Sequence, residues 1–142
     1  MDFRHLFFDF NGRIPRSSYW LGTLALSAYV LLVVGFAIFM GVELGPRSLL
    51  LLVLALPAVY CGLALVVKRL HDRDKSGWWV LLFYFAPGFL HRIGLHTGDI
   101  GILFWLLGSA ISVWALVEIG FLRGTPGPNR FGPDPLPQPY PA

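Results

Sequence analysis

The chain has 142 residues, of which 56% are apolar and only 13% are charged, with a formal net charge of +3. A soluble domain carries roughly 25% charged residues. The apolar residues form long blocks with almost no polar faces, which argues against a soluble helical bundle. The composition therefore predicts one membrane domain. The basic residues form no run typical of a nucleic-acid tail, so no nucleic-acid partner is expected.

The N-terminal segment predicts a short helix in the headgroup region. Phe3, Phe7 and Phe10 would share one helical face, while Asp2 and Arg4 keep the segment polar. A cleavable signal peptide is not expected, because the first apolar run starts late, is too long and lacks a cleavage site.

Four apolar blocks follow, and they predict an all-α membrane protein with spans at residues 19–40, 48–67, 78–95 and 100–122. The first block extends about 33 Å as a helix at ~1.5 Å per residue. Pro57 interrupts the second block and predicts either a tolerated bend or a hinge. The third block is short and contains Pro87, so it is either a span or a re-entrant segment.

Orientation follows from the lysines and arginines. Nine lie at the N-terminus, in residues 68–75 and in the tail, whereas only Arg47 and Arg92 lie in the other two connections. The positive-inside rule then places both termini in the cytoplasm, which requires an even number of crossings. Residues 1–135 are expected to form a single membrane domain.

Seven of the 11 prolines lie from Pro126 onward, which excludes a helix or buried strand there. Residues 136–142 are expected to form a disordered tail. The mixture of aromatic and charged side chains in residues 129–134 predicts docking onto the charged segment instead.

Residues 67–79 read as a charged loop between two apolar blocks. Lys68, Arg69 and His71 suit the C-terminal end of the second helix, whereas a carboxylate such as Asp72 is repelled there by the helix dipole. Asp72 has two candidate compensations: local pairing with Lys68 and Arg69, or a partly buried pair with Arg13 or Arg16 on the same membrane face.

Three motifs give the chain a resemblance to the bacterial membrane family called domain of unknown function 805. They are residues 12–20 (Gly-Arg-Ile-Pro-Arg-Ser-Ser-Tyr-Trp), residues 68–79 (Lys-Arg-Leu-His-Asp-Arg, then Ser-Gly-Trp-Trp) and residues 124–135 (Gly-Thr-Pro-Gly, then Asn-Arg-Phe-Gly-Pro-Asp-Pro). Two features depart from the family pattern: Asp74 replaces a frequent glycine or other small residue, and residues 91–99 resemble an insertion. The resemblance implies a multi-pass protein of the inner membrane without an assigned activity.

The candidate site is a charged cluster with a structural or ligand-binding role. Its members are Arg13, Arg16, Arg69, His71, Asp72, Arg73, Asn129, Arg130 and Asp134. Catalysis by His71 and Asp72 is disfavoured, because no nucleophile with a recognisable setting accompanies them. His91, His96 and Asp99 match no strong metal template, so neither a metal nor a cofactor is expected.

Three functional classes remain. The favoured one is a structural or interaction module whose cytoplasmic charged motifs clamp the bundle and bind anionic lipid headgroups or a partner protein. The others are a subunit of a small transporter or channel and a lipid-modifying enzyme, and the spans carry few of the buried polar residues that transport needs. Membrane lipids, a second copy of the chain or another membrane protein are the expected partners.

Overall fold

In the computed structural model of the chain, residues 3–42 and 49–136 are described, and their regular structure is helical apart from one isolated bridge between Asn129 and Gly132. The element order is α1 (Phe3–Phe8), α2 (Arg16–Phe39), α3 (Leu49–Asp72), the π-helix η1 (Leu81–Phe85), α4 (Ala86–Gly94), the 3-10 helix η2 (Gly98–Ile100), α5 (Gly101–Leu116) and the π-helix η3 (Val117–Phe121). The all-helical prediction is confirmed for these residues.

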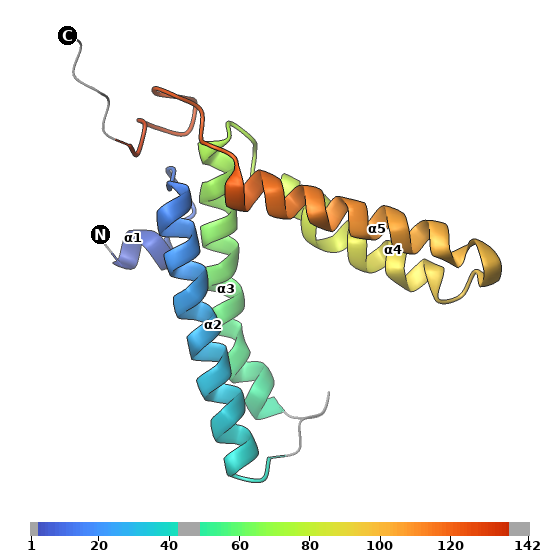
Figure 1. Cartoon of the computed structure of the whole chain (residues 1–142). Coiled ribbons are helices and arrows are strands. Elements are labelled where there is room, and N and C mark those ends of the chain that lie inside the picture. The colour runs from blue at the N-terminus through green and yellow to red at the C-terminus, as the bar shows by residue number, and fades with distance from the viewer. Residues whose placement is uncertain (1–2, 43–48, 137–142) are drawn as a thin grey trace.

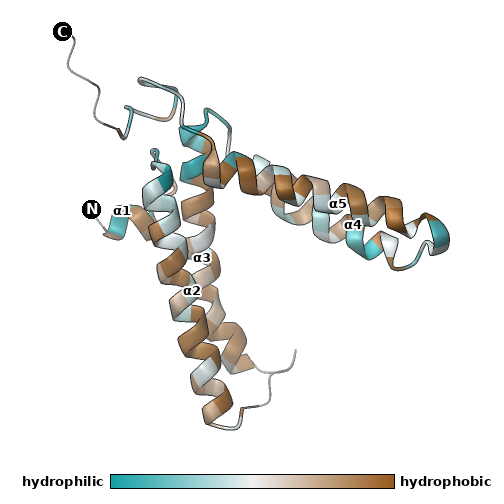
Figure 2. Cartoon of the chain, in the orientation of Figure 1, coloured by the Kyte–Doolittle hydropathy of each residue, from teal (hydrophilic) through white to brown (hydrophobic). Residues whose placement is uncertain are grey.

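The helices form two hairpins that diverge from a common end (Figure 1). α2 lies beside α3 in one hairpin, and α4 lies beside α5 in the other. At the common end, residues 3–18, 65–80 and 117–136 meet, and we call this region the junction. The teal polar segments of Figure 2 gather mainly there, whereas the two helical pairs are largely brown.

Three helices of the described chain are long and apolar enough to cross a membrane. They are Arg16–Phe39, Leu51–Asp72 and Gly98–Phe121, with mean hydropathies of 2.3, 2.2 and 2.2. The first, second and last predicted spans are therefore present. The third predicted span, residues 78–95, is helical only over residues 79–94, which is about 24 Å at ~1.5 Å per residue. This helix is too short to count among the candidate spans, so the fourth span stays a prediction.

The prediction of a charged loop from residue 67 is wrong in its first half. α3 continues to Asp72, and the chain leaves the helix only at Arg73. The end of an apolar block marks where a helix leaves lipid, whereas the helix itself continues as long as its side chains find partners. α3 also continues through Pro57. Phe10 was expected on the N-terminal helix, but α1 ends at Phe8.

The protein buries few apolar side chains, as expected of helices that face lipid. One buried cluster consists of Val66, Leu70, Val80, Phe83, Ala115 and Ile119, and a second of Leu6, Ile14 and Leu65. Both lie at or near the junction. The buried apolar clusters therefore lie at the end where the charged residues gather.

Away from the junction, α4 and α5 pack through glycines. A Cβ built on Gly108 would lie 2.7 Å from Nε2 of His91 and 3.1 Å from the carbonyl oxygen of Pro87. The ring of His91 stacks on Trp105 at 4.4 Å between ring centroids. Small residues let two helices approach closely, which is a common way to join helices in a membrane.

Candidate functional site

Five charged side chains are buried at the junction: Arg13, Lys68, Arg69, Asp72 and Glu118, each with at most 6% of its surface exposed. Side chains of these types are almost never buried without partners. Every buried side-chain nitrogen and oxygen in the described residues has a hydrogen-bond partner. The buried charges of the junction therefore form a polar network in which each side chain has identifiable partners.

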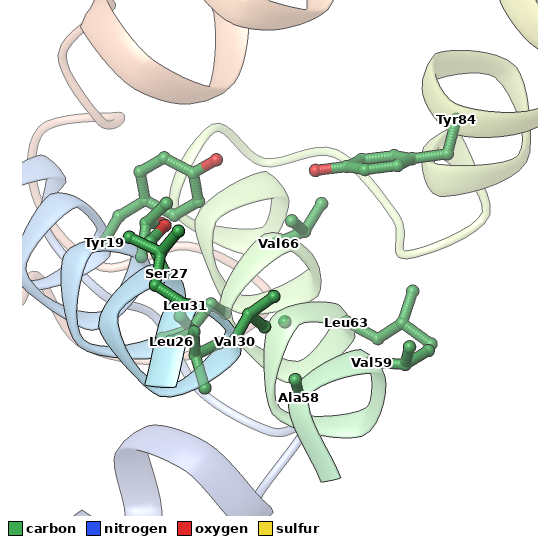
Figure 3. A pocket seen from close by; sticks show the side chains of 13 residues that line it. Tyr19, Leu26, Ser27, Val30, Leu31, Ala58, Val59, Leu63, Val66 and Tyr84 are labelled. Atoms are coloured by element: carbon green, nitrogen blue, oxygen red, sulfur yellow. The ribbon is translucent and has the colours of Figure 1, made fainter. Parts of the chain in front are cut away.

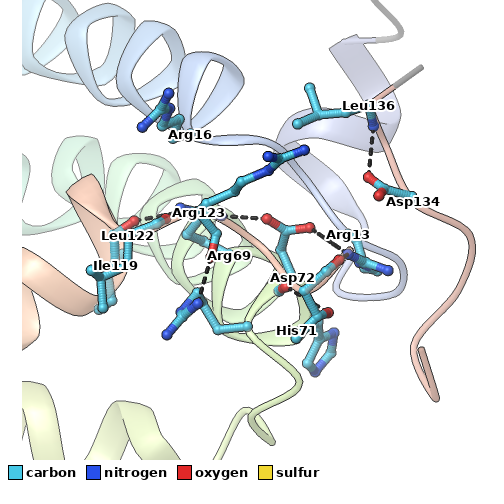
Figure 4. Close-up of polar contacts among 12 residues, drawn as sticks. Arg13, Arg16, Arg69, His71, Asp72, Ile119, Leu122, Arg123, Asp134 and Leu136 are labelled. Atoms are coloured by element: carbon cyan, nitrogen blue, oxygen red, sulfur yellow. Dashed lines mark hydrogen bonds and ion pairs between the residues drawn. The ribbon is translucent and has the colours of Figure 1, made fainter. Parts of the chain in front are cut away.

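Asp72 binds two arginines from different parts of the chain (Figure 4). Its Oδ1 accepts a hydrogen bond from Nε of Arg13 at 3.1 Å, and the Nη2 of Arg13 lies 3.0 Å away. Its Oδ2 pairs with Nη1 of Arg69. Each of the two predicted sets of partners for Asp72 therefore supplies one arginine. Arg69 pairs with it locally and Arg13 across the junction, whereas Lys68 and Arg16 do not pair with it.

Arg13 also connects the first segment of the chain to the last. Its Nη2 donates to the carbonyl oxygen of Thr125 at 2.6 Å, and its Nη1 donates to that of Gly127 at 2.7 Å. One guanidinium thus joins the residues before α2, the end of α3 and the C-terminal segment. A planar group with five donors suits this bridging role, which lysine cannot reproduce.

Arg69 fastens α3 to the end of the last helix. Its Nε donates to the carbonyl oxygen of Ile119 at 2.8 Å, and its Nη2 donates to that of Leu122. The final carbonyl groups of a helix have no partners within the helix, so a cation placed there satisfies them and suits the helix dipole.

Gly124 belongs to the third sequence motif, and the structure shows why this position is a glycine. A Cβ at this residue would overlap the carboxylate of Asp72. The adjacent backbone NH of Thr125 donates to the carbonyl oxygen of Asp72 at 2.8 Å. Close approach of backbone to carboxylate therefore requires glycine here, irrespective of backbone conformation.

The docking predicted for residues 129–134 is present. Nδ2 of Asn129 donates to the carbonyl oxygen of His71 at 2.9 Å. The ring of Phe131 stacks on that of His71, with centroids 3.9 Å apart and planes within 4°. Arg130 pairs with Asp74 at 3.2 Å. The tail predicted at 136–142 lies, except for Leu136, outside the described residues.

Two neighbouring details explain the local chemistry of this docking. Asp74 has a φ of 56°, a left-handed conformation that glycine adopts freely and that aspartate tolerates better than most residues. Asp134 accepts hydrogen bonds from the backbone NH groups of Leu136 and Gly127, each at 2.9 Å. These bonds favour the ionised carboxylate and lower the pKa of Asp134.

Sequence reasoning missed the second buried carboxylate. The Oε1 of Glu118 accepts a hydrogen bond from Nε of Arg73 at 3.0 Å and lies 3.8 Å from Nζ of Lys75. The sequence does contain a signal for this pairing, because a carboxylate inside an apolar block requires a cationic partner.

Lys68 has a role that was also missed. Its Nζ donates to the backbone oxygens of His5 and Leu6, at 2.7 Å for Leu6. These are carbonyl groups of the short α1. Lys68 therefore holds α1 against α3 and does not compensate Asp72.

The described arrangement does not join His71 to Asp72 as an acid–base pair. Nδ1 of His71 lies 3.2 Å from the carbonyl oxygen of Gly12, and the carboxylate of Asp72 binds arginines. No group of three or more His, Cys, Asp or Glu residues within the described ranges could hold a metal ion.

The junction brings together Arg13, Arg69, His71, Asp72 and Asn129, with Arg73, Arg130 and Asp134 at its margin. Arg16 is exposed, and its Nη1 lies 3.4 Å from the carbonyl oxygen of Phe121. His91, His96 and Asp99 lie where α4 joins α5, at the far end of that hairpin (Figure 1).

A model of the family described as "Protein of unknown function (DUF805)" matches residues 7–133. The chain is similar to the inner membrane protein YhaI of Escherichia coli strain K12, with 34% identity over 126 residues, covering 89% of this chain and 85% of that protein. It is also similar to the uncharacterized protein YiiR of the same strain, with 30% identity over 138 residues, covering 94% of this chain and 90% of that protein.

A third similar protein is the inner membrane protein YhaH of the same strain, 28% identical over 138 residues, covering 92% of this chain and 89% of that protein. None of these three names describes an enzymatic activity. No solved structure matches the chain significantly. The names of the relatives and the three apolar helices fit a multi-pass protein of the inner membrane.

Proposed function

Because this chain belongs to the DUF805 family of unknown function, we propose that it is a structural and interaction module of the inner membrane. In this role the junction clamps the two hairpins together and presents a positive surface to anionic lipid headgroups. The observation that carries the proposal is the position of Asp72, buried between Arg13 and Arg69, which reach the C-terminal segment and the end of the last helix.

The orientation proposed for this module places the junction in the cytoplasm. The described basic residues gather there, whereas Arg92 lies at the far end of the α4–α5 hairpin. This distribution agrees with the positive-inside rule. In a Cys61→Ala background, a single cysteine at Lys75 should react with an impermeant reagent only from the cytoplasmic side. Reaction only from the outside would contradict this orientation.

Lipid contact is supported by the charge of the junction. The junction holds nine lysines and arginines and five aspartates and glutamates, which leaves a charge of +4 (nine minus five). The candidate cluster contains five arginines that could bind lipid phosphate groups. Arg13 and Arg69 are buried and bonded internally, which leaves Arg16, Arg73 and Arg130 for this role. Each basic residue near an anionic surface contributes about 1 kcal/mol of attraction.

A double-mutant cycle tests the clamp. Repulsion at the helix end alone predicts that Asp72→Asn is neutral or stabilising by up to ~1 kcal/mol. The clamp predicts the opposite sign, a cost of about 2–4 kcal/mol, because Arg13 and Arg69 lose their counter-charge at a buried site. The measured quantity is the free energy of unfolding in mixed micelles.

Arg13→Gln supplies the second change, and Arg16→Gln serves as the matched control. We expect a coupling energy with Asp72→Asn of about 1–3 kcal/mol for Arg13 and below roughly 0.5 kcal/mol for Arg16. Weak coupling to Arg13, or equal coupling to both arginines, would reject the clamp.

A further inference from the structure

A cavity of about 640 Å³ lies along α2 and α3, with Tyr84 of η1 at its edge (Figure 3). Val59, Leu63 and Val66 of α3 and Val30 of α2 line it with apolar surface. Its volume falls within the range of roughly 300–1,000 Å³ that is typical of small-molecule sites. The clamp at the junction makes no use of this space.

The cavity opens on the lipid-facing surface. Three residues that line it are themselves exposed: Leu31 at 72%, Val59 at 56% and Tyr84 at 54%. A hydrophobic chain from the bilayer could enter sideways without any rearrangement of the helices. The size and lining of the cavity therefore suit an elongated apolar group.

A few hydroxyl groups interrupt the apolar lining of the cavity. Tyr19, Thr23 and Ser27 of α2 line it, and the hydroxyl groups of Tyr19 and Tyr84 point toward one another in Figure 3. Hydroxyl groups along an apolar cavity suit a molecule with ester or glycerol oxygens at one end and hydrocarbon at the other.

Arg16 lies at the polar end of the same helix face. It precedes Thr23 by seven residues and Ser27 by eleven, and both spacings return to one side of an α-helix. Its side chain is exposed, and it begins a helix with neither an acidic residue in the first turn nor a side-chain cap. A helix start of this kind attracts anions, and the positive charge of the junction adds to the attraction.

We propose that the cavity holds an acyl chain of one anionic phospholipid, with its glycerol region beside Tyr19 and Thr23 and its phosphate at Arg16 and the start of α2. The inference rests on the proposed function, in which the protein contacts anionic lipids, and it locates one such lipid at the cavity. A phospholipid fits better than a second copy of the chain, because apolar surface, hydroxyl groups and a cation follow one another along a single helix face.

Native mass spectrometry of the full chain in a mild detergent tests the assignment, with dioleoylphosphatidylglycerol and dioleoylphosphatidylcholine as probes. Gly62 lines the cavity, and a Cβ built there meets only Leu26, at 3.9 Å, so Gly62→Leu should fill the space without displacing backbone. Gly35→Leu is the matched control, because Gly35 is exposed, lies outside the cavity and has nothing within 4 Å of an added Cβ.

We expect the wild type to retain one phosphatidylglycerol in preference to phosphatidylcholine. Gly62→Leu should weaken retention about tenfold, since excluding two methylene groups has about that effect, whereas Gly35→Leu should behave as the wild type. Ser27→Leu fills the cavity from the opposite wall and repeats the test if Gly62→Leu fails to fold. Arg16→Gln should abolish the preference for phosphatidylglycerol, with Arg92→Gln as its control.

Equal retention by the Gly62→Leu and Gly35→Leu variants would overturn the cavity as the site while leaving the lipid contact of the proposed function intact. A preference that survives Arg16→Gln would overturn the phosphate assignment. A dimer that Gly62→Leu dissociates would show that a second copy fills the cavity. If the wild type shows no preference for phosphatidylglycerol, the lipid contact and this inference both fail, and the clamp stands on its own test.

Discussion

The two ends of the α4–α5 hairpin are held by different means. At the junction, η3 meets the end of α3 and the turn after it through Arg69, Arg73 and Glu118, all charged side chains with specific partners. At the other end, Gly94, Gly101 and Gly108 let the two helices approach closely, and His91 stacks on Trp105. The ion pairs Arg13–Asp72, Arg69–Asp72, Arg73–Glu118, Lys75–Glu118 and Arg130–Asp74 lie at the junction.

The difference follows from what each end must join. α4 and α5 are neighbours in the sequence, so close packing is enough to keep them together. The junction joins segments more than 100 residues apart, as in the bonds of Arg13 to Thr125 and Gly127. Directional bonds to single oxygen atoms fix such distant segments in one arrangement, which non-directional apolar contact cannot do.

The largest expected effect comes from Arg69→Met. It removes the donors that Ile119 and Leu122 use and leaves Asp72 with Arg13 alone. We expect a loss of about 3–5 kcal/mol in the free energy of unfolding, as for other broken buried pairs. Arg92→Met, at the exposed far end, should change it by less than about 0.5 kcal/mol. Similar free energies of unfolding for the two variants would show that buried charges at the junction do not stabilise the protein more than exposed charges at the far end.

Gly108→Ala tests the far end. The added methyl group would meet His91 and the carbonyl oxygen of Pro87, so the α4–α5 pair should lose about 1–3 kcal/mol. Gly88→Ala is the matched control in the same hairpin, because nothing lies within 4 Å of its added Cβ, and it should be neutral or stabilising by about 0.5–1 kcal/mol. The measurement is thermal unfolding in detergent. A destabilised Gly88→Ala variant would mean that helix flexibility, rather than close approach, requires these glycines.

The smallest expected effect concerns the C-terminal segment. A chain ending before Asn129 loses the hydrogen bond of Asn129 to His71 and the stack of Phe131 on His71, and we expect a cost of about 1–2 kcal/mol. A chain ending before Leu136 keeps these contacts and should unfold at nearly the wild-type temperature. Equal unfolding temperatures for the two truncations would show that the docked segment adds no stability.

Local rules applied to the sequence identified Asp72 as misplaced, and the predicted membrane topology offered Arg13 or Arg16 as its partner. Three of the four predicted spans match apolar helices long enough to cross a membrane to within a few residues, except that the second helix continues to Asp72. Residues 78–95 remain a predicted span. The positions missed were those whose role depends on a distant backbone atom: Lys68 on the carbonyl groups of α1, and Gly124 on the carboxylate of Asp72. No pattern of side chains along the sequence reports which carbonyl groups are left without partners.

The direction of protein synthesis gives the bonds of Arg13 a further consequence. Arg13 leaves the ribosome more than 100 residues before two of its acceptors, Thr125 and Gly127. Both hairpins are therefore made while this guanidinium still lacks those partners, and a chain that stops early leaves its donors unpaired. The junction can therefore be completed only after the chain has been made as far as Gly127.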